Sequence, residues 1–252
     1  MIKIKTPQEL KIMREGGKIL ADTLWEVVKS IRPGVSELEL DALAEKLIRE
    51  KGAEPGFKKV PEYNNTICAS TNDVVVHGVP SGYRLREGDI IGIDCGVYYK
   101  GFHTDMAETV KVSAQSSDKV DRFLEIGKKA LEAGLKQAKL GNHVGDISKV
   151  IQDIVEAQNG YSVVRSLVGH GVGRKLHEDP EVPGYLIGKI EKTPRLIEGM
   201  VIAIEVIYNM GGPELVFANN DRWTLKTEDG SLAGLFERTV AITKSGPQIL
   251  TK

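Results

Sequence analysis

Two segments of this chain repeat almost the same strand-like sequence. Positions 85 to 94 read LREGDIIGID and positions 196 to 205 read LIEGMVIAIE, with Leu, Glu, Gly, Ile and Ile in register and a carboxylate as the last residue of each. A repeat of this kind indicates two related halves. The fold must then supply an equivalent strand from each half, which restricts the architecture to a duplicated one.

Other features occur in the same order in both halves. Gly34, before one expected helix, corresponds to Gly141 before another. The further matched sets are His77-Gly78-Val79 with His170-Gly171-Val172, and the apolar stripe Leu40, Leu43, Leu47 with Ile147, Val150, Ile154. We therefore expect one domain, residues 1–252, made of halves at about 1–115 and 116–252. A ligand site is expected in the groove between them.

Helix and strand patterns alternate along the chain. Thr6-Pro7 predicts the start of a first helix, and Ser36 with Glu39 forms a capping-box pattern before a second helix that ends near Gly52. The glycines of the GHGVG stretch predict a closely approaching loop. The other expected elements are helices at 120–139 and 147–158 and strands at 66–69, 73–77, 89–99, 104–112, 161–167, 200–210 and 235–243.

Composition excludes several classes of protein. Thirty-four basic and 35 acidic residues give a net charge of -1, so no basic field favours nucleic acid or a membrane surface. The N-terminal MIKIKTPQEL lacks the apolar core of a signal peptide, and no run approaches the roughly 18 apolar residues of a membrane span. The two cysteines have no CxxC spacing, which supports neither a disulfide framework nor a structural zinc site. We expect a cytoplasmic protein.

Two carboxylates of the first half are predicted to lie close together. Alternation along the strand places Asp94 on the same face as Gly92 and Gly96, with open space around it. A hairpin turn at 99–101 then brings Asp105 nearly opposite Asp94. Two carboxylates so close cannot both ionise in a buried site unless a cation lies between them.

The second half contains two further acids in apolar strands. Glu205 lies in VIAIEVIY and Glu237 in AGLFERTVAI. A buried unpaired charge costs several kcal/mol, so each acid needs a partner. Any one of them could pair with a basic neighbour, as Glu237 could with Arg238. Four acids that face one groove favour a metal site instead.

The stretch GHGVGRKLHEDP supplies nitrogen ligands. His170 and His177 are too far apart for an HExxH zinc helix, and the glycines lack the GK[ST] or GxGxxG context of a nucleotide loop. A lone histidine is more often a packed core residue than a ligand. Carboxylates with one or two imidazoles suit Mn(II), Fe(II) or Co(II), with zinc also possible. Such sets usually hold two ions roughly 3.5 to 4 Å apart.

These residues resemble those of the type I methionine aminopeptidases, over essentially the whole chain. The resemblance rests on the motifs NDVVVHGVP and GHGVGRKLHEDP and on the ordered set Asp94, Asp105, His170, Glu205, Glu237. It implies an α+β pita-bread fold, in which pseudo-twofold duplicated halves form an antiparallel sheet flanked by helices. The implied reaction is removal of the initiator methionine from nascent proteins when the second residue is small. The resemblance further implies a bacterial-type monomeric enzyme that contacts the ribosome.

Roles follow from the same resemblance. Asp105 and Glu237 would bridge two divalent ions, Asp94 would complete one site, and His170 with Glu205 the other. Glu205 would also carry the proton of the attacking water. His177 would stabilise the oxyanion, and His77 would contact the substrate near the scissile amide. The implied methionine pocket consists of Phe57, Cys68, Leu176 and Trp223, with Leu176 where the family commonly has an aromatic residue.

The chain departs from the family pattern in three places. Arg238 follows Glu237 where the family has histidine, Val206 follows Glu205 where it has proline, and the loop 58–65 differs at the pocket edge. Two alternatives stay open. An Xaa-Pro aminopeptidase shares the fold and ligands but normally has an additional N-terminal domain. A pita-bread binding protein without activity would typically lack some ligands.

Overall fold

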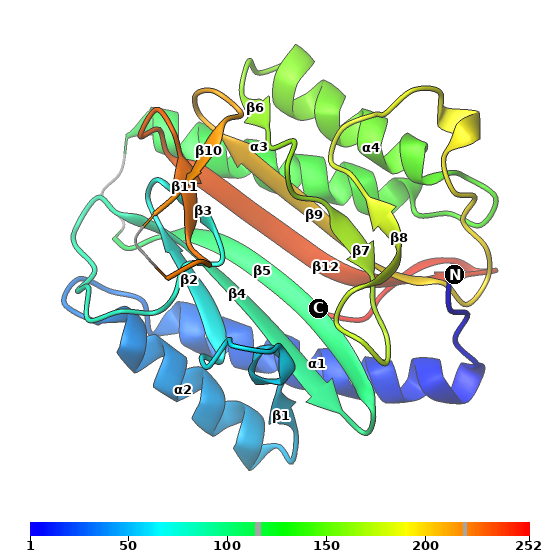
Figure 1. Ribbon diagram of the computed structural model, residues 1–252, viewed down its shortest axis with the longest axis horizontal. Coiled ribbons are helices and arrows are strands. Elements are labelled where there is room, and N and C mark those ends of the chain that lie inside the picture. The colour runs from blue at the N-terminus through cyan, green and yellow to red at the C-terminus, as the bar shows by residue number, and fades with distance from the viewer. Residues whose placement is uncertain (114–116, 219–220) are drawn as a thin grey trace.

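The chain forms one large antiparallel sheet with two pairs of helices packed against it (Figure 1). The computed structural model describes residues 1–113, 117–218 and 221–252. Helices α1 (Pro7–Lys29) and α2 (Glu37–Glu50) belong to the first half. Helices α3 (Asp118–Gln137) and α4 (Val144–Gln152) belong to the second, and α4 continues as a π-helical turn, Asp153–Ala157. All four expected helices are thereby confirmed, with starts shifted by up to three residues.

The helix starts follow local capping chemistry. The Thr6 hydroxyl accepts the Glu9 backbone N–H while the Glu9 carboxylate accepts the Thr6 backbone N–H. Ser36 and Glu39 make the same reciprocal pair at the start of α2. These caps satisfy backbone donors that a helix start otherwise leaves open, so both boundaries are encoded within four residues.

The strands of the main sheet run in the order β1-β4-β5-β12-β9-β7-β8, with β2 beside β4, β6 beside β9 and β13 beside β12. A smaller sheet has the order β10-β11-β3. The bounds are β1 Glu54–Pro55, β2 Ile67–Thr71, β3 Val74–Val76, β4 Ile90–Tyr99, β5 Phe102–Lys111, β6 Ser162–Val163, β7 Gly169–Gly171, β8 Glu178–Val182, β9 Val201–Asn209, β10 Leu215–Phe217, β11 Leu225–Thr227, β12 Ala233–Thr243 and β13 Gly246–Ile249. Short 3-10 turns cover Phe57–Lys59 and Ile190–Lys192.

The duplication appears directly in the sheet order. The two repeated segments lead into β4 and β9, which flank the central pair β5 and β12 symmetrically. The strand pairs β4–β5 and β12–β9 are therefore equivalent parts of the two halves, and β5 with β12 joins them. The expected boundary between halves, at 115 and 116, lies outside the described residues.

One strand prediction and one loop prediction are wrong. The expected strand 161–167 is regular only at Ser162–Val163, since its backbone pairing with β9 ends at Val164, whose N–H donates to the Ile207 carbonyl at 3.0 Å. The expected loop at Gly169–Gly171 is strand β7. Its glycines do allow a close backbone approach, since a Cβ at Gly171 would lie 2.1 Å from the Asp179 carbonyl oxygen.

The helices cover one face of the sheet and leave the other face for polar side chains. Ile91, Ile93 and Cys95 of β4 lie in one apolar cluster with Leu20 and Leu24 of α1, as the alternation predicts. In the second half, alternate residues of β9 pack in the same way in a cluster that includes α3 and α4. The intervening residues of β4, β5, β9 and β12 face away from the helices.

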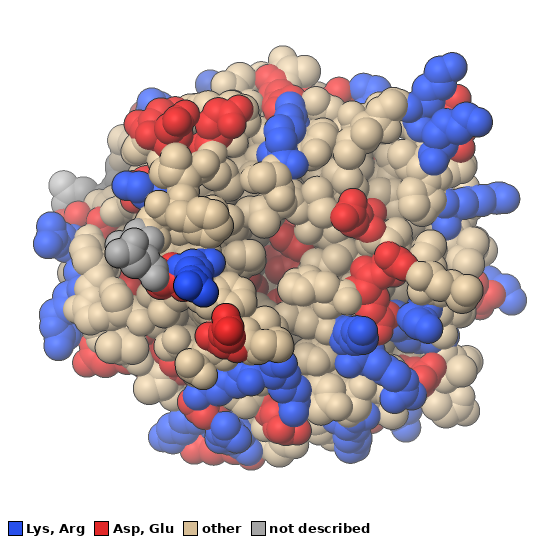
Figure 2. Space-filling model, viewed as in Figure 1, with Lys and Arg blue, Asp and Glu red and all other residues tan. Residues whose placement is uncertain are grey.

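On the opposite face, positive and negative side chains are mixed. Lys and Arg side chains are interspersed with Asp and Glu, and acidic side chains line the bottom of a central hollow (Figure 2). Across the described ranges, no helix has both the length and the apolar character to cross a membrane. Cys68 on β2 and Cys95 on β4 are buried free thiols.

Candidate metal centre

Four predicted acids meet on the helix-free face of the sheet. Register pairs Asp94 with Ala107, Ala107 with Glu237, and Glu237 with Glu205, so these side chains form one row across β4, β5, β12 and β9. Directly paired residues project to the same face. Asp105 lies two residues from Ala107 and shares that face. The pseudo-twofold relation therefore delivers two carboxylates from each half to one place.

A two-residue turn fixes the first pair. Lys100 and Gly101 both have positive φ, 47° and 91°, which is the conformation that matches the twist of a tight hairpin. The resulting register places Asp105 opposite Gly96, one step diagonal from Asp94. The predicted approach of the two aspartates is thus confirmed, with a diagonal rather than a direct contact.

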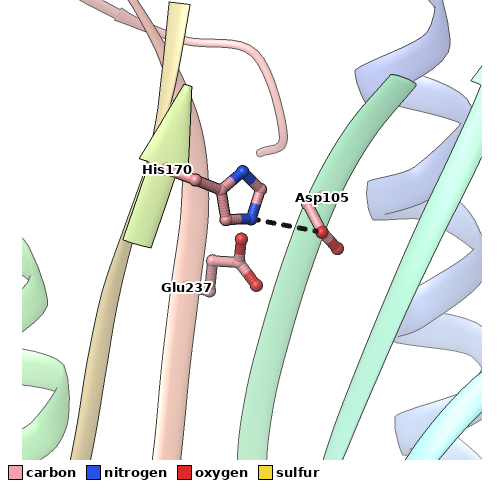
Figure 3. Close-up of side chains that lie close together, drawn as sticks. All are labelled: Asp105, His170 and Glu237. Carbon is pink, nitrogen blue, oxygen red and sulfur yellow. Dashed lines mark ion pairs between the residues drawn. The ribbon is translucent and has the colours of Figure 1, made fainter. Parts of the chain in front are cut away.

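His170 completes the cluster from β7. Its Nδ1 lies 2.9 Å from the Gly171 carbonyl oxygen, which can only accept, so Nδ1 carries the proton. The unprotonated Nε2 lies 3.5 Å from Glu205 Oε1 and 3.9 Å from Asp105 Oδ2. Three potential ligand atoms lie within 4.8 Å of one another, one each from Asp105, His170 and Glu237. The three side chains point toward a common centre (Figure 3).

Burial makes this cluster unfavourable for anions on their own. It raises the pKa of Asp94 to about 7. Burial, followed by the neighbouring carboxylates, raises the pKa values of Asp105, Glu205 and Glu237 well above their usual range. Burial also lowers the pKa of His170 to about 3, so its imidazole is neutral. A neutral imidazole among acids that gain from a nearby cation is the electrostatic pattern of a metal site.

The donor set fits divalent cations. Asp94 Oδ1 and Glu237 Oε1 are buried without a hydrogen-bond partner among the described residues, and buried polar atoms normally have one. Arg238 does not neutralise the Glu237 carboxylate. Its guanidinium lies on the helix side of β12, where it pairs with Glu108 at 2.7 Å and donates to the Glu237 backbone carbonyl. Arg238 is therefore not the ion-pair partner of the Glu237 carboxylate, and a divalent cation would satisfy both open oxygens.

Two more histidines border the acids. The His177 ring packs edge-on against His170, with ring centroids 4.3 Å apart. His77 follows β3 in a left-handed conformation, φ 55°, which is uncommon outside glycine and marks a position held by its surroundings. Burial lowers the pKa of His77 to about 4 and also lowers that of His177. Both rings are neutral at pH 7 and each has an N–H to donate.

An apolar pocket adjoins the acids. The four predicted pocket residues line it, and a cavity of about 100 Å³ connects it with all five predicted metal ligands. These residues are Phe57, Cys68, Leu176 and Trp223. The space expected beside Asp94 is closed on one side, because the Phe57 ring packs on Gly96, where a Cβ would lie 2.7 Å from a ring carbon.

Two further residues, Val60 and Tyr63, line the pocket and were not predicted from the sequence. Tyr63 is buried, donates its hydroxyl to the Ile67 carbonyl at 2.8 Å, and packs edge-on against Trp223 with centroids 5.1 Å apart. Both residues lie in the loop 58–65, where no periodic pattern marks a buried side chain. The signal that was available is a bulky aromatic in a polar loop, five residues before Cys68.

Known proteins with similar sequences identify the family of this chain. Residues 11–244 match metallopeptidase family M24. The methionine aminopeptidase of Clostridium perfringens is 45% identical over 251 residues, which cover 100% of this chain and 99% of the relative. Methionine aminopeptidase 1 of Bacillus subtilis is 46% identical over 252 residues, which cover 100% of both.

Solved structures discriminate within the family. Methionine aminopeptidase from Thermotoga maritima superposes with a TM-score of 0.95 at 39% identity, covering 100% of both chains. Prolidase from Pyrococcus furiosus reaches 0.79 at 26% identity and is covered over only 65% of its length. The pita-bread fold is thereby confirmed. The chain belongs to metallopeptidase family M24 and, within it, to the methionine aminopeptidases.

Proposed function

We propose that this protein removes the initiator methionine from polypeptides whose second residue is small. The proposal rests on the junction of the five predicted ligands with an apolar pocket. An N-terminal residue bound there would have its side chain among Phe57, Tyr63 and Cys68. Thioether sulfur packs favourably against aromatic rings, which suits methionine.

The proposed cofactor is a pair of divalent ions, Co, Mn or Fe(II), with Zn possible, because carboxylate oxygen dominates the donor set. When bound, such ions polarise the scissile carbonyl and make a nearby water more acidic. Asp105 and Glu237 would be shared between the ions, Asp94 would bind one, and His170 with Glu205 the other. The unprotonated Nε2 of His170 supports its part in this assignment.

The remaining groups handle protons and the developing charge. Glu205 would accept the proton of the attacking water and pass it to the leaving amine. His177, neutral and beside His170, would donate its N–H to the carbonyl oxygen as negative charge develops there. His77, at the pocket wall next to Trp223, would hold the peptide near the scissile bond.

The proposed setting is the cytoplasm, where a monomeric protein with one catalytic domain of two halves acts on nascent chains at the ribosome. The resemblance supports the ribosome contact. The net charge of -1 argues against a general affinity for nucleic acid.

Mass spectrometry of three peptides tests the proposal. Metal-stripped protein is incubated anaerobically with Met-Ala-Ser, Met-Lys-Ser or Ala-Pro-Ser, alone and with Mn(II), Fe(II) or Co(II). We expect metal-dependent loss of methionine from Met-Ala-Ser only. Cleavage of Ala-Pro-Ser instead would indicate an Xaa-Pro aminopeptidase, and no cleavage with any metal would indicate a binding protein.

A further inference from the structure

A buried ion pair joins the N-terminal segment to the loop that carries His177. Lys5 Nζ lies 2.8 Å from Glu178 Oε2, and the two side chains are only 4% and 7% exposed. The Lys5 backbone N–H donates to the Gly199 carbonyl at 2.8 Å, which fixes the segment beside the start of β9. Breaking one side of a buried pair leaves an uncompensated charge, so this contact constrains both segments strongly.

The pair also shapes the turn around His177. The second oxygen of Glu178 accepts the Lys175 backbone N–H at 3.2 Å, so one carboxylate closes the turn 175–178 and receives Lys5. Gly173 leaves the space that Lys5 occupies, because a Cβ there would lie 2.5 Å from Lys5 Cε. The Gly173 carbonyl accepts the His103 backbone N–H of β5 at 2.7 Å. The loop is therefore held from β5 and from the N-terminal segment.

A second ion pair connects the same loop to α1 but lies at the protein surface. Arg174 pairs with Glu9 at 2.8 Å, and the Arg174 side chain is 67% exposed. Exposed pairs contribute little because solvent screens them and the side chains lose freedom. The chain thus contains a matched pair of contacts to one loop, one buried and one exposed.

We infer that Lys5 is a positioning residue, which acts through Glu178 to hold the His177 ring against His170 at the metal centre. The inference rests on the proposed function, in which His177 donates to the reacting carbonyl oxygen. His177 immediately precedes Glu178, so displacement of that carboxylate moves the imidazole. A donor displaced by about 1 Å can lose up to about 100-fold in rate while the substrate still binds. We therefore expect displacement of His177 to lower kcat and to leave KM nearly unchanged.

The test uses the metal-loaded full chain and Met-Ala-Ser. Lys5→Met keeps most of the length of the side chain without its charge, and the double variant Lys5→Met/Glu178→Gln removes both charges and so preserves folding if the single variant does not. We expect kcat to fall about tenfold or more in either variant, with KM within about twofold. Arg174→Met, the matched control, should keep kcat within about twofold. Melting temperature and bound metal are measured for each variant, so that only folded, loaded protein is compared.

A double-mutant cycle with His177→Ala separates positioning from a structural role. If Lys5 acts through His177, Lys5→Met lowers kcat no further in the His177→Ala background. An equal loss of kcat in both backgrounds, or unchanged kcat in Lys5→Met and in the double variant, would overturn the inference. Unchanged kcat in His177→Ala alone would instead refute the role of His177 in the proposed function, and with it the route assigned to Lys5.

Discussion

Gly96 of β4 packs against the Phe57 ring of the proposed methionine pocket. A Cβ at this position would lie 2.7 and 2.8 Å from two ring carbons of Phe57, whereas ordinary contact begins near 3.4 Å. In Gly96→Ala the ring must therefore retreat by about 0.7 Å into the cluster that it forms with Tyr63 and Cys68. Overpacking of this kind costs about 1–3 kcal/mol. If this free energy is lost from substrate binding in the pocket, KM for Met-Ala-Ser rises about 5- to 140-fold.

Steady-state kinetics of two matched variants isolates this effect. Gly92 lies on the other side of Asp94, and the nearest atom to a Cβ there would be the Thr109 hydroxyl oxygen at 3.2 Å, followed by Ser70 atoms at 3.6 and 3.7 Å. Gly92→Ala should leave KM within about twofold of the wild type. Phe57→Leu, which shortens the displaced side chain, should restore part of the affinity of Gly96→Ala. Equal increases of KM in Gly92→Ala and Gly96→Ala, or no relief by Phe57→Leu, would refute the packing argument.

Two predictions concern stability. Hydrogen bonds from Gln152, Arg165 and the Val163 N–H outweigh burial and hold the pKa of Glu156 below its usual range. The ionised Glu156 carboxylate therefore stabilises the folded state above its unfolded pKa of about 4.3. This stabilisation is lost as the pH falls through the lower pKa of the folded state. Urea unfolding should therefore show Glu156→Gln less stable than wild type at pH 7 and equal to it at strongly acidic pH. A constant difference would contradict this. Glu108→Gln leaves the mostly buried Arg238 unpaired, so the free energy of unfolding should fall by about 3–5 kcal/mol, and a loss below about 1 kcal/mol would contradict the prediction.

The strands that carry the predicted metal ligands could be recognised in the sequence because each is marked by a local pattern. Alternation alone places Asp94 on the face opposite Ile91 and Ile93, and an acid within an apolar run marks Glu205 and Glu237 in the same way. The duplication adds the information that the two strands occupy equivalent places. Capping pairs within four residues fixed the helix starts for the same reason.

The pocket edge depends on contacts between distant segments. Tyr63 is buried because Trp223, 160 positions away in the sequence, packs on it, and no periodicity in the loop 58–65 records that contact. The closure of Gly96 by Phe57 has the same origin. The short strands β7, β10 and β11 have only three residues each, so their identity comes from their partners rather than from their own sequence.

Arg238 illustrates a departure that the structure explains. Its place beside Glu237 in the sequence suggested an ion pair with that carboxylate, but alternation sends the Arg238 side chain to the helix face. There it pairs with Glu108, which also pairs with Lys128 of α3 at 3.3 Å, and its guanidinium lies over the Trp25 ring of α1. The Arg238 side chain is thus accommodated between α1 and α3.

Counting bound metal tests the central claim most directly. Metal-stripped wild type and Glu237→Gln are dialysed anaerobically against Mn(II), and bound manganese per chain is measured by elemental analysis over a range of free concentrations. The five-ligand site predicts about two ions per wild-type chain and weaker binding in Glu237→Gln, whose open buried oxygen belongs to the proposed bridge. Wild-type protein that binds no manganese, or a variant with an identical binding curve, would contradict the assignment of these residues as a metal centre.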